Sequence, residues 1–368
     1  MSSARSETST VLMIGTSPDT QGGVSSVVRE MLGSPLASAY RIRYVSTHCD
    51  GGLGRKLVAS VRGIFSTWCG LILRRPGLLH VHLASRASFW RKLAAVSPAW
   101  MLRIPVLVHL HGAEFRDFQE KESGPLGRFF IRQMLERSCR VVALSEGWRE
   151  WLDKQFPVAQ TQVIPNSVRL PEQARAVTSP SPTLLFMGRL GKRKGTHDLI
   201  RAFATLAALS PPPKLILAGD GDIAGARLLA EELGISQLVD TPGWVGPDAK
   251  ARLLQEATAY VLPSYNEGLP MSVLEAMAHG LPVVSTPVGG IPDAITDGED
   301  GFLVSPGDIE ALSSRLRMLL SDPELAGRIG DAAREKVRTR FATSAVIERW
   351  LRLYAELMPF ATSRTGAA

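Results

Sequence analysis

The sequence predicts an α/β protein with two doubly wound, Rossmann-like domains that face a central cleft. The chain has 368 residues, more than one ordinary hydrophobic core requires. Short apolar runs alternate with helix-like segments, the pattern of a parallel sheet with helices on both faces. A stretch rich in Ala, Ser and Pro, Ala174–Pro182, interrupts this alternation, which then begins again. We therefore expect one domain over residues 1–172, a second over 183–345, and a C-terminal helix over 346–368 that could return to the first domain.

The first domain begins with a short apolar run, Val11–Ile14, which ends at Gly15. A glycine-rich loop follows over residues 20–24, and a helical pattern covers Ser25–Leu32. Later strands are predicted, with helices between them, at four further runs: Arg41–Ser46, Leu78–Leu83, Val106–His109 and Val141–Ser145.

The second domain repeats the same alternation after the linker. Its strands are predicted at Thr183–Phe186, Lys214–Ala218, Tyr260–Leu262 and Pro282–Ser285. Its helices are predicted at Thr196–Leu209, at Ala224–Leu233, between the last two of these strands, and from Asp308 to about Phe360. Ligands of such sheets bind at the carboxyl ends of the strands, so the loops at those ends are the first place to look for chemistry.

Cysteine content and hydropathy indicate the compartment. The three cysteines, Cys49, Cys69 and Cys139, form no C-x-x-C pair and lie near no histidine at metal spacing. A sparse, odd set fits a reducing compartment, and each is expected to be a buried neutral thiol. Met1–Thr10 lacks the apolar core of a secretory signal, and Gly63–Leu73 is shorter than a membrane span. We expect a cytoplasmic protein, either free or peripheral to a membrane.

The excess positive charge lies in the first half of the chain. The formal net charge is +7, and through Arg169 there are 22 basic and 12 acidic residues. The remainder has 20 basic and 23 acidic residues. Such asymmetry favours an anionic surface or acceptor for the first domain. No nucleic-acid-binding motif accompanies the charge, so nucleic acid is not expected as a partner.

A basic, glycine-flanked loop follows the first strand of the second domain, over residues 188–195. Its glycines allow a close approach of the backbone to a ligand. Arg189 and Lys194 lie five residues apart on either side of the turn, where they could hold a diphosphate from two sides. A solvated basic loop with no ligand is the alternative interpretation.

A second loop, beginning at Pro263, joins a strand to a helix that Pro270 is suited to start. The backbone N–H groups of Gly268, Leu269 and the first helical turn would then face an anion such as phosphate. Glu267 lies in the loop, and Glu275 follows eight residues later among apolar helix residues. A carboxylate in such surroundings needs a partner, and a ribose diol is a suitable one. An exposed helix charge is the alternative for Glu275.

The Glu-x7-Glu pattern, the Arg189 and Lys194 pair and the Gly22-Gly23 loop together resemble the retaining glycosyltransferases of family 4, which have the GT-B fold. The resemblance covers nearly the whole chain and is strongest over Thr183–Pro306. It implies transfer of a hexose from a nucleoside-diphosphate sugar, either GDP-mannose or a UDP-sugar, to a glycan or polyprenyl-diphosphate-linked acceptor. Bacterial polysaccharide or glycoconjugate synthesis is the implied setting. The sugar nucleotide is a co-substrate, and neither a further cofactor nor a metal is expected.

The resemblance also implies a role for each matching residue. Arg189 and Lys194 would bind the donor diphosphate, Glu275 the ribose, and Glu267 the hydroxyls of the transferred sugar. His111 would lie near the reacting sugar. The expected catalytic residues are Glu267, His111, Arg189 and Lys194. The expected donor-binding residues are Gly22, Gly23, Arg189, Lys194, Trp244, Val245, Glu267, Gly268, Leu269, Pro270 and Glu275.

Four histidines alternate along two predicted strands of the first domain. We expect His80 and His109 to be satisfied core residues and His111, beside a glycine at its strand end, to belong to the active site. The role of His82 stays open. The sequence Asp220-Gly-Asp222 resembles a metal-binding pair, but an Asp-Gly turn after a strand is common, and the basic residues already offset a diphosphate.

Two basic, aromatic-bearing stretches suggest an acceptor held at a membrane. Leu53–Arg75 has apolar residues at helical spacing with basic residues between them, and Arg86–Lys92 is a second such run. A basic amphipathic segment can lie on an anionic bilayer, although an ordinary helix with its basic face in water has the same pattern. We expect peripheral attachment to the inner face of the cytoplasmic membrane.

Other functions remain open at this stage. A nucleotide-sugar epimerase could use the same fold, and would turn over donor without an acceptor. An inactive sugar-nucleotide-binding subunit is a second alternative, which the combined presence of Glu267, Glu275, Arg189 and Lys194 argues against. A Rossmann dehydrogenase is not expected, because no good Gly-x-Gly-x-x-Gly follows the first strand.

Overall fold

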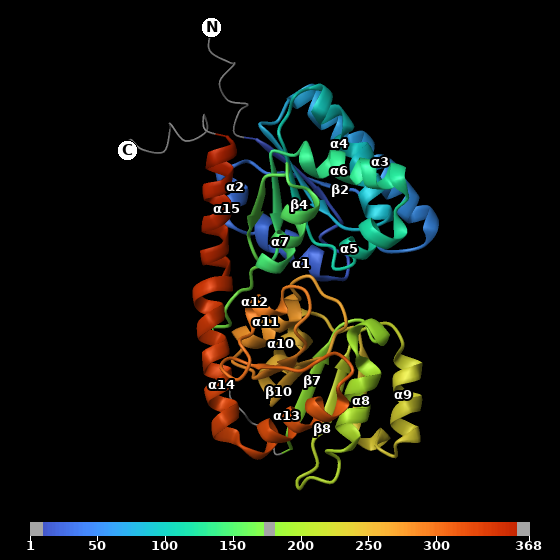
Figure 1. Ribbon diagram of the computed structural model, residues 1–368, viewed down its shortest axis with the longest axis vertical. Helices are drawn as coiled ribbons and strands as arrows, with labels where there is room; N and C mark the ends of the chain where they lie inside the picture. Colours follow the sequence, from blue (N-terminus) through green and yellow to red (C-terminus); the bar gives the residue numbers. More distant parts are fainter. Residues whose placement is uncertain (1–9, 173–180, 359–368) are drawn as a thin grey trace. The chain divides into compact units, whose positions relative to one another are not determined.

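The computed structural model describes residues 10–172 and 181–358, and Figure 1 traces them along the chain. These residues form two compact units. The first runs to Ser167 and also takes in the described residues from Thr343 onward, while the second extends from Val168 to Ala342. The chain therefore passes between units at 167/168 and 342/343, a few residues before the limits of 172 and 345 expected from the sequence. Most of the predicted linker, Ala174–Pro182, lies outside the described residues.

The first unit is built on a six-stranded parallel sheet of order β2-β1-β3-β4-β5-β6. Its strands are β1 (Val11–Gly15), β2 (Arg43–Ser46), β3 (Leu78–Leu83), β4 (Val106–Leu110), β5 (Arg140–Ala143) and β6 (Thr161–Val163). Every residue of β1, β3 and β4 is buried, because helices cover both faces of a parallel sheet. Strand β6 is a half-buried edge strand and lacks a long apolar run. For this reason it was not predicted from the sequence.

Helices of the first unit follow the strands in turn. They are α1 (Gly23–Leu32), α2 (Pro35–Ala39), α3 (Leu53–Arg74), α4 (Ala87–Met101), α5 (Phe115–Asp117), α6 (Pro125–Glu136), α7 (Glu146–Gln155) and α15 (Thr343–Leu357). Helix α15 lies beside α2 (Figure 1), although more than three hundred residues separate them. It buries Trp350 and Tyr354, and the Trp350 ring centroid lies 5.1 Å from that of His80. The C-terminal helix thus completes the core of the N-terminal sheet.

The second unit has its own six-stranded parallel sheet, of order β12-β11-β10-β7-β8-β9. Its strands are β7 (Thr183–Met187), β8 (Lys214–Ala218), β9 (Val239–Gly243), β10 (Ala259–Leu262), β11 (Val283–Ser285) and β12 (Phe302–Leu303). Its helices include α8 (Thr196–Ala204), α9 (Ile223–Glu232), α10 (Pro247–Glu256), α11 (Met271–Ala278), α12 (Ile291–Ala294), α13 (Ile309–Ser321) and α14 (Pro323–Lys336). The sequence analysis missed the two edge strands, β9 and β12. Pro242 is tolerated in β9 because an edge strand needs fewer ladder hydrogen bonds.

Candidate active site

The basic loop after β7 is held against the end of β10 by a glycine contact. Gly195 has a φ of +67°, and a Cβ at this position would lie only 2.0 Å from the Pro263 carbonyl oxygen. The Tyr265 N–H donates a 2.8 Å hydrogen bond to the Arg193 carbonyl oxygen, which joins the same two loops. The close approach carries Lys194 from the first loop to Glu267 in the second.

Lys194 and Glu267 form a buried ion pair. The Lys194 Nζ lies 2.5 Å from Glu267 Oε1, and the two side chains are 12% and 6% exposed. Ser264 Oγ donates a 2.7 Å hydrogen bond to the same carboxylate oxygen. A buried carboxylate needs such partners, because an unpaired buried charge is costly. Two residues predicted to serve the site are therefore in contact, and Ser264, which the sequence analysis did not single out, holds one of them.

Arg189 differs from Lys194 in its surroundings. Its side chain is 70% exposed, and its guanidinium lies 3.3 Å from Asp220 Oδ2. The side chain of Asp222 instead accepts a hydrogen bond from the Gly225 N–H at the start of α9. The Asp220-Gly-Asp222 turn thus has a partner for each carboxylate within the described residues. Arg189 is thus one of the accessible cations of this loop, while Lys194 is enclosed.

The backbone of the Glu267 loop is fixed by a second glycine. Gly289 has a φ of +59°, and a Cβ there would lie 1.9 Å from the Glu267 carbonyl oxygen. The neighbouring Gly290 N–H donates a hydrogen bond of 2.5 Å to the Gly268 carbonyl oxygen. Leu269 and Pro270 continue the loop as buried residues, and Pro270 occupies the N-cap position of α11. The conformation of this loop is therefore set by residues about twenty positions further along the chain.

Glu275 lies inside α11 and has a basic partner. Lys250 Nζ, from α10, lies 2.6 Å from Glu275 Oε1, and the Glu275 side chain is 15% exposed. The carboxylate is neither an exposed helix charge nor unpaired. Sequence reasoning missed Lys250, because it lies on another helix and no local pattern marks it as a partner.

Four further predicted donor-site residues lie at a helix start or directly after a strand. Gly22 precedes α1 with a φ of +135°, and a Cβ there would meet nothing within 4 Å. Gly23 is the first residue of that helix. Trp244 and Val245 directly follow β9, where Trp244 is 50% exposed and Val245 is half-buried. Each is placed at the carboxyl end of a strand or at the start of the helix after it, the region in which such sheets bind ligands.

His111 is the first residue after β4 and is half-buried. Its Nε2 shares a 2.8 Å hydrogen bond with Nδ1 of His82, the residue whose role the sequence left open. Burial, with a smaller effect from the Lys92 charge, lowers the pKa of His111 to about 3. His111 is therefore a neutral imidazole at physiological pH, able to donate or accept a hydrogen bond but not to supply positive charge.

His80 and His109 are buried as predicted, but the prediction that they are satisfied is wrong in part. His80 Nδ1 shares a 2.6 Å hydrogen bond with Tyr354 Oη, while its Nε2 has no partner among the described residues. Neither ring nitrogen of His109 has a hydrogen-bond partner there. The burial of these two histidines was predicted correctly. Their hydrogen-bond partners could not be predicted, because those partners depend on neighbouring strands and on α15.

Comparison with known families agrees with this architecture. The model of the glycosyl transferases group 1 matches residues 172–336, and that of the glycosyl transferase 4-like domain matches residues 10–167. The chain belongs to this family of glycosyltransferases and has its GT-B fold.

Relatives in the family have varied products. The glycogen synthase of Mycobacterium tuberculosis (strain CDC 1551 / Oshkosh) is 28% identical over 289 residues, covering 76% of this chain and 69% of that protein. The N-acetyl-alpha-D-glucosaminyl L-malate synthase of Bacillus anthracis is 29% identical, covering 76% and 75%. The D-inositol 3-phosphate glycosyltransferase of Corynebacterium jeikeium (strain K411) is 34% identical, covering 53% and 49%. Their names agree on glycosyl transfer and differ in what is made.

Solved structures share the fold. Sucrose-phosphate synthase from Thermosynechococcus elongatus has a TM-score of 0.81 at 21% identity, covering 95% of this chain and 99% of that one. HepE of Anabaena in complex with UDP-glucose has a TM-score of 0.74 at 19% identity, covering 94% and 99%. At this level of identity the likeness concerns the fold alone.

Proposed function

We propose that this glycosyltransferase moves a hexose from a nucleoside-diphosphate sugar, with retention of anomeric configuration and without a metal. The acceptor is a glycan or a polyprenyl-diphosphate-linked glycan of bacterial polysaccharide synthesis. The observation that carries the proposal is the Lys194–Glu267 pair at the carboxyl ends of β7 and β10, with the exposed Arg189 on the same loop as Lys194.

The charges suit a diphosphate leaving group. The Arg189 guanidinium is exposed and can bind phosphate oxygens through two N–H groups. Lys194 is held by Glu267 and adds a fixed positive charge beside it. Stabilising the charge that develops on the departing diphosphate is the main contribution expected from such groups.

The two carboxylates have separate tasks in this proposal. Lys194 and Ser264 both contact Oε1 of Glu267, and we assign its Oε2 to hydroxyls of the transferred sugar. Glu275, oriented by Lys250, accepts hydrogen bonds from the ribose hydroxyls. The neutral His111 contacts the transferred sugar. The acceptor oxygen attacks the anomeric carbon from the side of the leaving diphosphate, and a diphosphate oxygen takes the acceptor proton.

Calorimetry would test the donor proposal. Binding of UDP and GDP, and of their sugar conjugates, would be measured without metal for the wild type and for Arg189→Ala. Arg201→Ala, a half-exposed arginine on α8, is the control. We expect selective binding of one diphosphate, weakened about tenfold in Arg189→Ala alone. Absence of binding to every diphosphate by the folded wild type would remove the proposal.

The product of the reaction distinguishes the proposed retaining transfer from the alternative functions. Once the donor is known, the anomeric configuration of the transferred sugar would be read by NMR. A retained configuration is expected, and an inverted one overturns the front-face mechanism. Conversion of donor to its epimer without an acceptor would identify an epimerase, and binding without any turnover would identify an inactive subunit.

Helix α3 supports peripheral attachment to an anionic membrane. Its buried residues are Ser60, Gly63, Thr67 and Leu71, and among these four only Leu71 has a large apolar side chain. Large apolar side chains face outward instead, and the exposed ones are Leu53, Leu57, Val58, Val61, Phe65, Trp68, Ile72 and Leu73. The exposed basic residues along and just after the helix are Arg55, Lys56, Arg62, Arg74 and Arg75. An outward apolar stripe among basic residues matches an anionic lipid surface.

The packing of α3 favours lying on the bilayer over crossing it. By length and composition the helix qualifies as a membrane span, and an 18-residue window within it has a mean hydropathy of 1.3. However, a Cβ at Gly63 would lie 2.5 Å from the Ser46 carbonyl oxygen, so the helix backbone is packed directly on β2. We propose that α3 keeps this contact and inserts only its outward side chains.

The second basic run, Arg86–Lys92, does not contribute as the sequence suggested. Arg86 is ion-paired with Glu114 and Glu122, and Lys92 is 2% exposed. Only Trp90, at 43% exposed, presents a large apolar side chain there. The prediction that Arg86–Lys92 is a second membrane-facing basic stretch is therefore wrong, because Arg86 is ion-paired and Lys92 is buried. The membrane proposal rests on α3.

Vesicle co-sedimentation would test this part. Phosphatidylglycerol and phosphatidylcholine vesicles would be compared at low salt, with wild type and Val61→Ser, Phe65→Ser. Leu228→Ser, a similarly exposed leucine in the second unit, is the control. We expect binding to the anionic vesicles alone, reduced at least tenfold in the double variant. Equal binding of the double variant, or no binding by the wild type, contradicts the proposal.

A further inference from the structure

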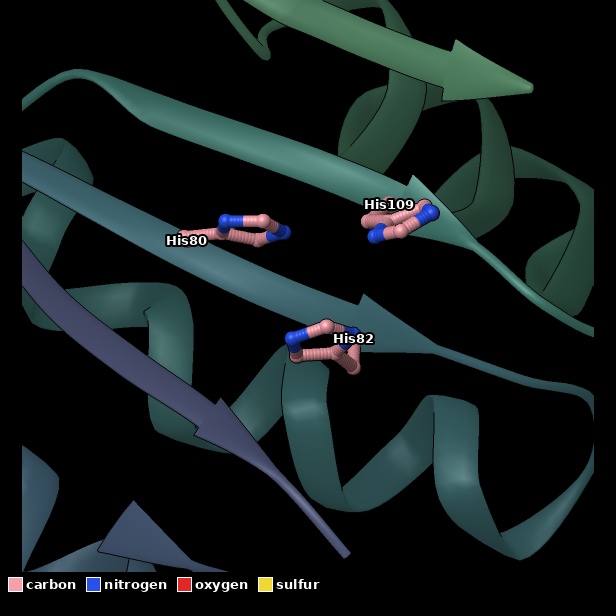
Figure 2. Close-up of side chains that lie close together, drawn as sticks. All are labelled: His80, His82 and His109. Atoms are coloured by element: carbon pink, nitrogen blue, oxygen red, sulfur yellow. The ribbon is translucent and has the colours of Figure 1, made fainter. Parts of the chain in front are cut away.

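Three buried histidines gather on one face of the first sheet (Figure 2). His80 and His82 alternate along β3, and His109 on β4 stands in register with His82. All three are at most 2% exposed, and one ring nitrogen from each lies within 4.8 Å of the others. Their adjacency follows from parallel pairing of two strands that each have histidine at alternate positions.

Hydrogen bonds orient two of these rings. His80 Nδ1 is held by Tyr354 Oη at 2.6 Å, and His82 Nδ1 by His111 Nε2 at 2.8 Å. In each ring the nitrogen left over is Nε2, and neither Nε2 has a hydrogen-bond partner among the described residues. If the Nδ1 atoms carry the protons, both Nε2 lone pairs are free.

The third ring makes the arrangement costly without a ligand. Neither nitrogen of His109 has a hydrogen-bond partner within the described part of the chain. A buried polar group without a hydrogen-bond partner is unfavourable, because it has lost its hydrogen bonds to water. Four such nitrogens in one buried cluster beside the Trp350 ring therefore call for a partner that accepts several lone pairs at once.

We propose that His80 Nε2, His82 Nε2 and one ring nitrogen of His109 bind a late transition-metal ion, with Zn²⁺ as the expected occupant. Imidazole nitrogens bind zinc at about 2.0–2.1 Å, which places them about 3.3 Å apart in a tetrahedron. One ring nitrogen of each residue lies within 4.8 Å of the others, so binding requires the three rings to turn and move closer together. An all-nitrogen ligand set excludes Mg²⁺ and Ca²⁺, which prefer oxygen.

The outer contacts fit a metal site. Metal-bound histidines usually donate their second N–H to a neighbouring group, which fixes ring orientation. Tyr354 and His111 occupy these positions for His80 and His82. Since Tyr354 belongs to α15, a bound ion would tie β3 and β4 to the C-terminal helix, and its role would be structural. The ion would lie next to His111, which is hydrogen-bonded to His82 and to which the proposed function gives a contact with the transferred sugar, although the proposed reaction itself uses no metal.

Charge limits the affinity of this site. The three imidazoles are neutral ligands, and the cluster includes no carboxylate to offset a dication. The buried Lys92 adds repulsion, because it lies close enough to lower the pKa of both His82 and His111. We therefore expect weaker zinc binding than at a site with cysteine ligands.

Metal titration of the full-length, tag-free protein tests the proposal. After treatment with EDTA, ZnCl₂ would be added in a calorimeter, and bound zinc counted by mass spectrometry after gel filtration. We expect one zinc per chain, a rise in melting temperature, and no competition from excess Mg²⁺. Co²⁺ should give the intense visible absorption of a tetrahedral nitrogen site. Failure of the folded wild type to bind zinc, or an octahedral Co²⁺ spectrum, overturns the proposal.

Variants locate the ion. His109→Leu and His82→Leu should each lose the stoichiometric zinc, whereas His197→Gln and His279→Gln in the second unit should keep it. Undiminished binding by folded His109→Leu and His82→Leu would assign the ion to other residues and end the proposal. If those variants do not fold, the wild-type stoichiometry and Co²⁺ spectrum still decide.

Discussion

Lys194 Nζ lies 2.5 Å from Glu267 Oε1, so an ion pair joins the loop after β7 to the loop after β10, 73 residues later. The pair is nearly enclosed, whereas Arg189 on the same loop as Lys194 is exposed. An arriving diphosphate would therefore meet an exposed guanidinium and an ammonium held by its ion pair. Fixed charges need no reorganisation during the reaction, which is the property expected of groups that stabilise a leaving anion.

Replacing Glu267 should separate binding from turnover. Glu267→Gln keeps the shape of the side chain but removes the charge that pairs with Lys194. We expect turnover to fall about 100-fold or more, the size of a lost transition-state contact. Binding of the free nucleoside diphosphate should be kept or tightened, because Lys194 loses its competing carboxylate. Calorimetry with the diphosphate and a product assay would check both, and unchanged turnover would contradict the assigned role.

Replacing Glu275 should weaken the binding only of ligands that contain a ribose. Glu275→Gln removes the carboxylate that we assign to the ribose diol, so nucleoside-diphosphate binding should weaken about tenfold. Binding of inorganic pyrophosphate, which has no ribose, should be unchanged and serves as the internal control. Equal losses for both ligands would instead indicate that the variant has disturbed the phosphate site.

Gly289 should not tolerate a side chain. Its φ of +59° and the 1.9 Å approach of a Cβ to the Glu267 carbonyl oxygen both oppose alanine. Gly298→Ala is the matched control, because Gly298 has a φ of +81° with nothing within 4 Å. The control should lose about 1–2 kcal/mol of unfolding free energy from backbone strain. Gly289→Ala should lose more, and any folded fraction should have reduced activity. Similar urea midpoints for the two variants would show that the close approach is easily relieved.

Lys92 should make stability depend on pH. Burial lowers the pKa of Lys92 to about 7 from an unfolded value of 10.5, so between these pH values the unfolded chain binds more protons. The unfolding free energy should therefore rise as the pH increases from about 7 to about 10. Lys92→Met should be more stable than the wild type at pH 7 by at least about 1 kcal/mol, the energy of one pKa unit.

The same variant provides the check at high pH. Its advantage should shrink toward pH 10, where the wild-type lysine is neutral when folded and has begun to lose its proton when unfolded. Lys121→Met, an exposed lysine paired with Asp117, is the control and should have no such slope. Urea unfolding at pH 7 and 10 measures all three proteins, and a constant difference between Lys92→Met and wild type would refute the assignment.

Buried elements were readily predicted from the sequence. The bounds of β3 and β8 agree with the predicted Leu78–Leu83 and Lys214–Ala218, because a strand covered on both faces is mostly apolar along its length. The loops carrying Arg189, Lys194 and Glu267 were placed at strand ends for the same reason. Edge strands β6, β9 and β12 were missed, since their pairing rather than their own composition makes them strands.

The outward face of α3 could not be predicted from its periodicity. Its apolar and basic residues have the spacing of a helix packed by its apolar side, yet Ser60, Gly63 and Thr67 face inward. Which face is buried depends on the surface that receives the helix. Here the close contact with β2 requires small side chains, and this leaves the large apolar ones outside.

The sequence by itself determined two parallel α/β sheets, their order along the chain and the loops that carry the chemistry. Only the tertiary structure decided the partners: Glu267 for Lys194, Lys250 for Glu275, and His82 for His111. Local composition specifies whether a segment is a strand or a helix, because that depends on neighbours in the chain. Side-chain partners from distant segments depend on strand order and helix placement, which become defined only when the whole sheet is assembled.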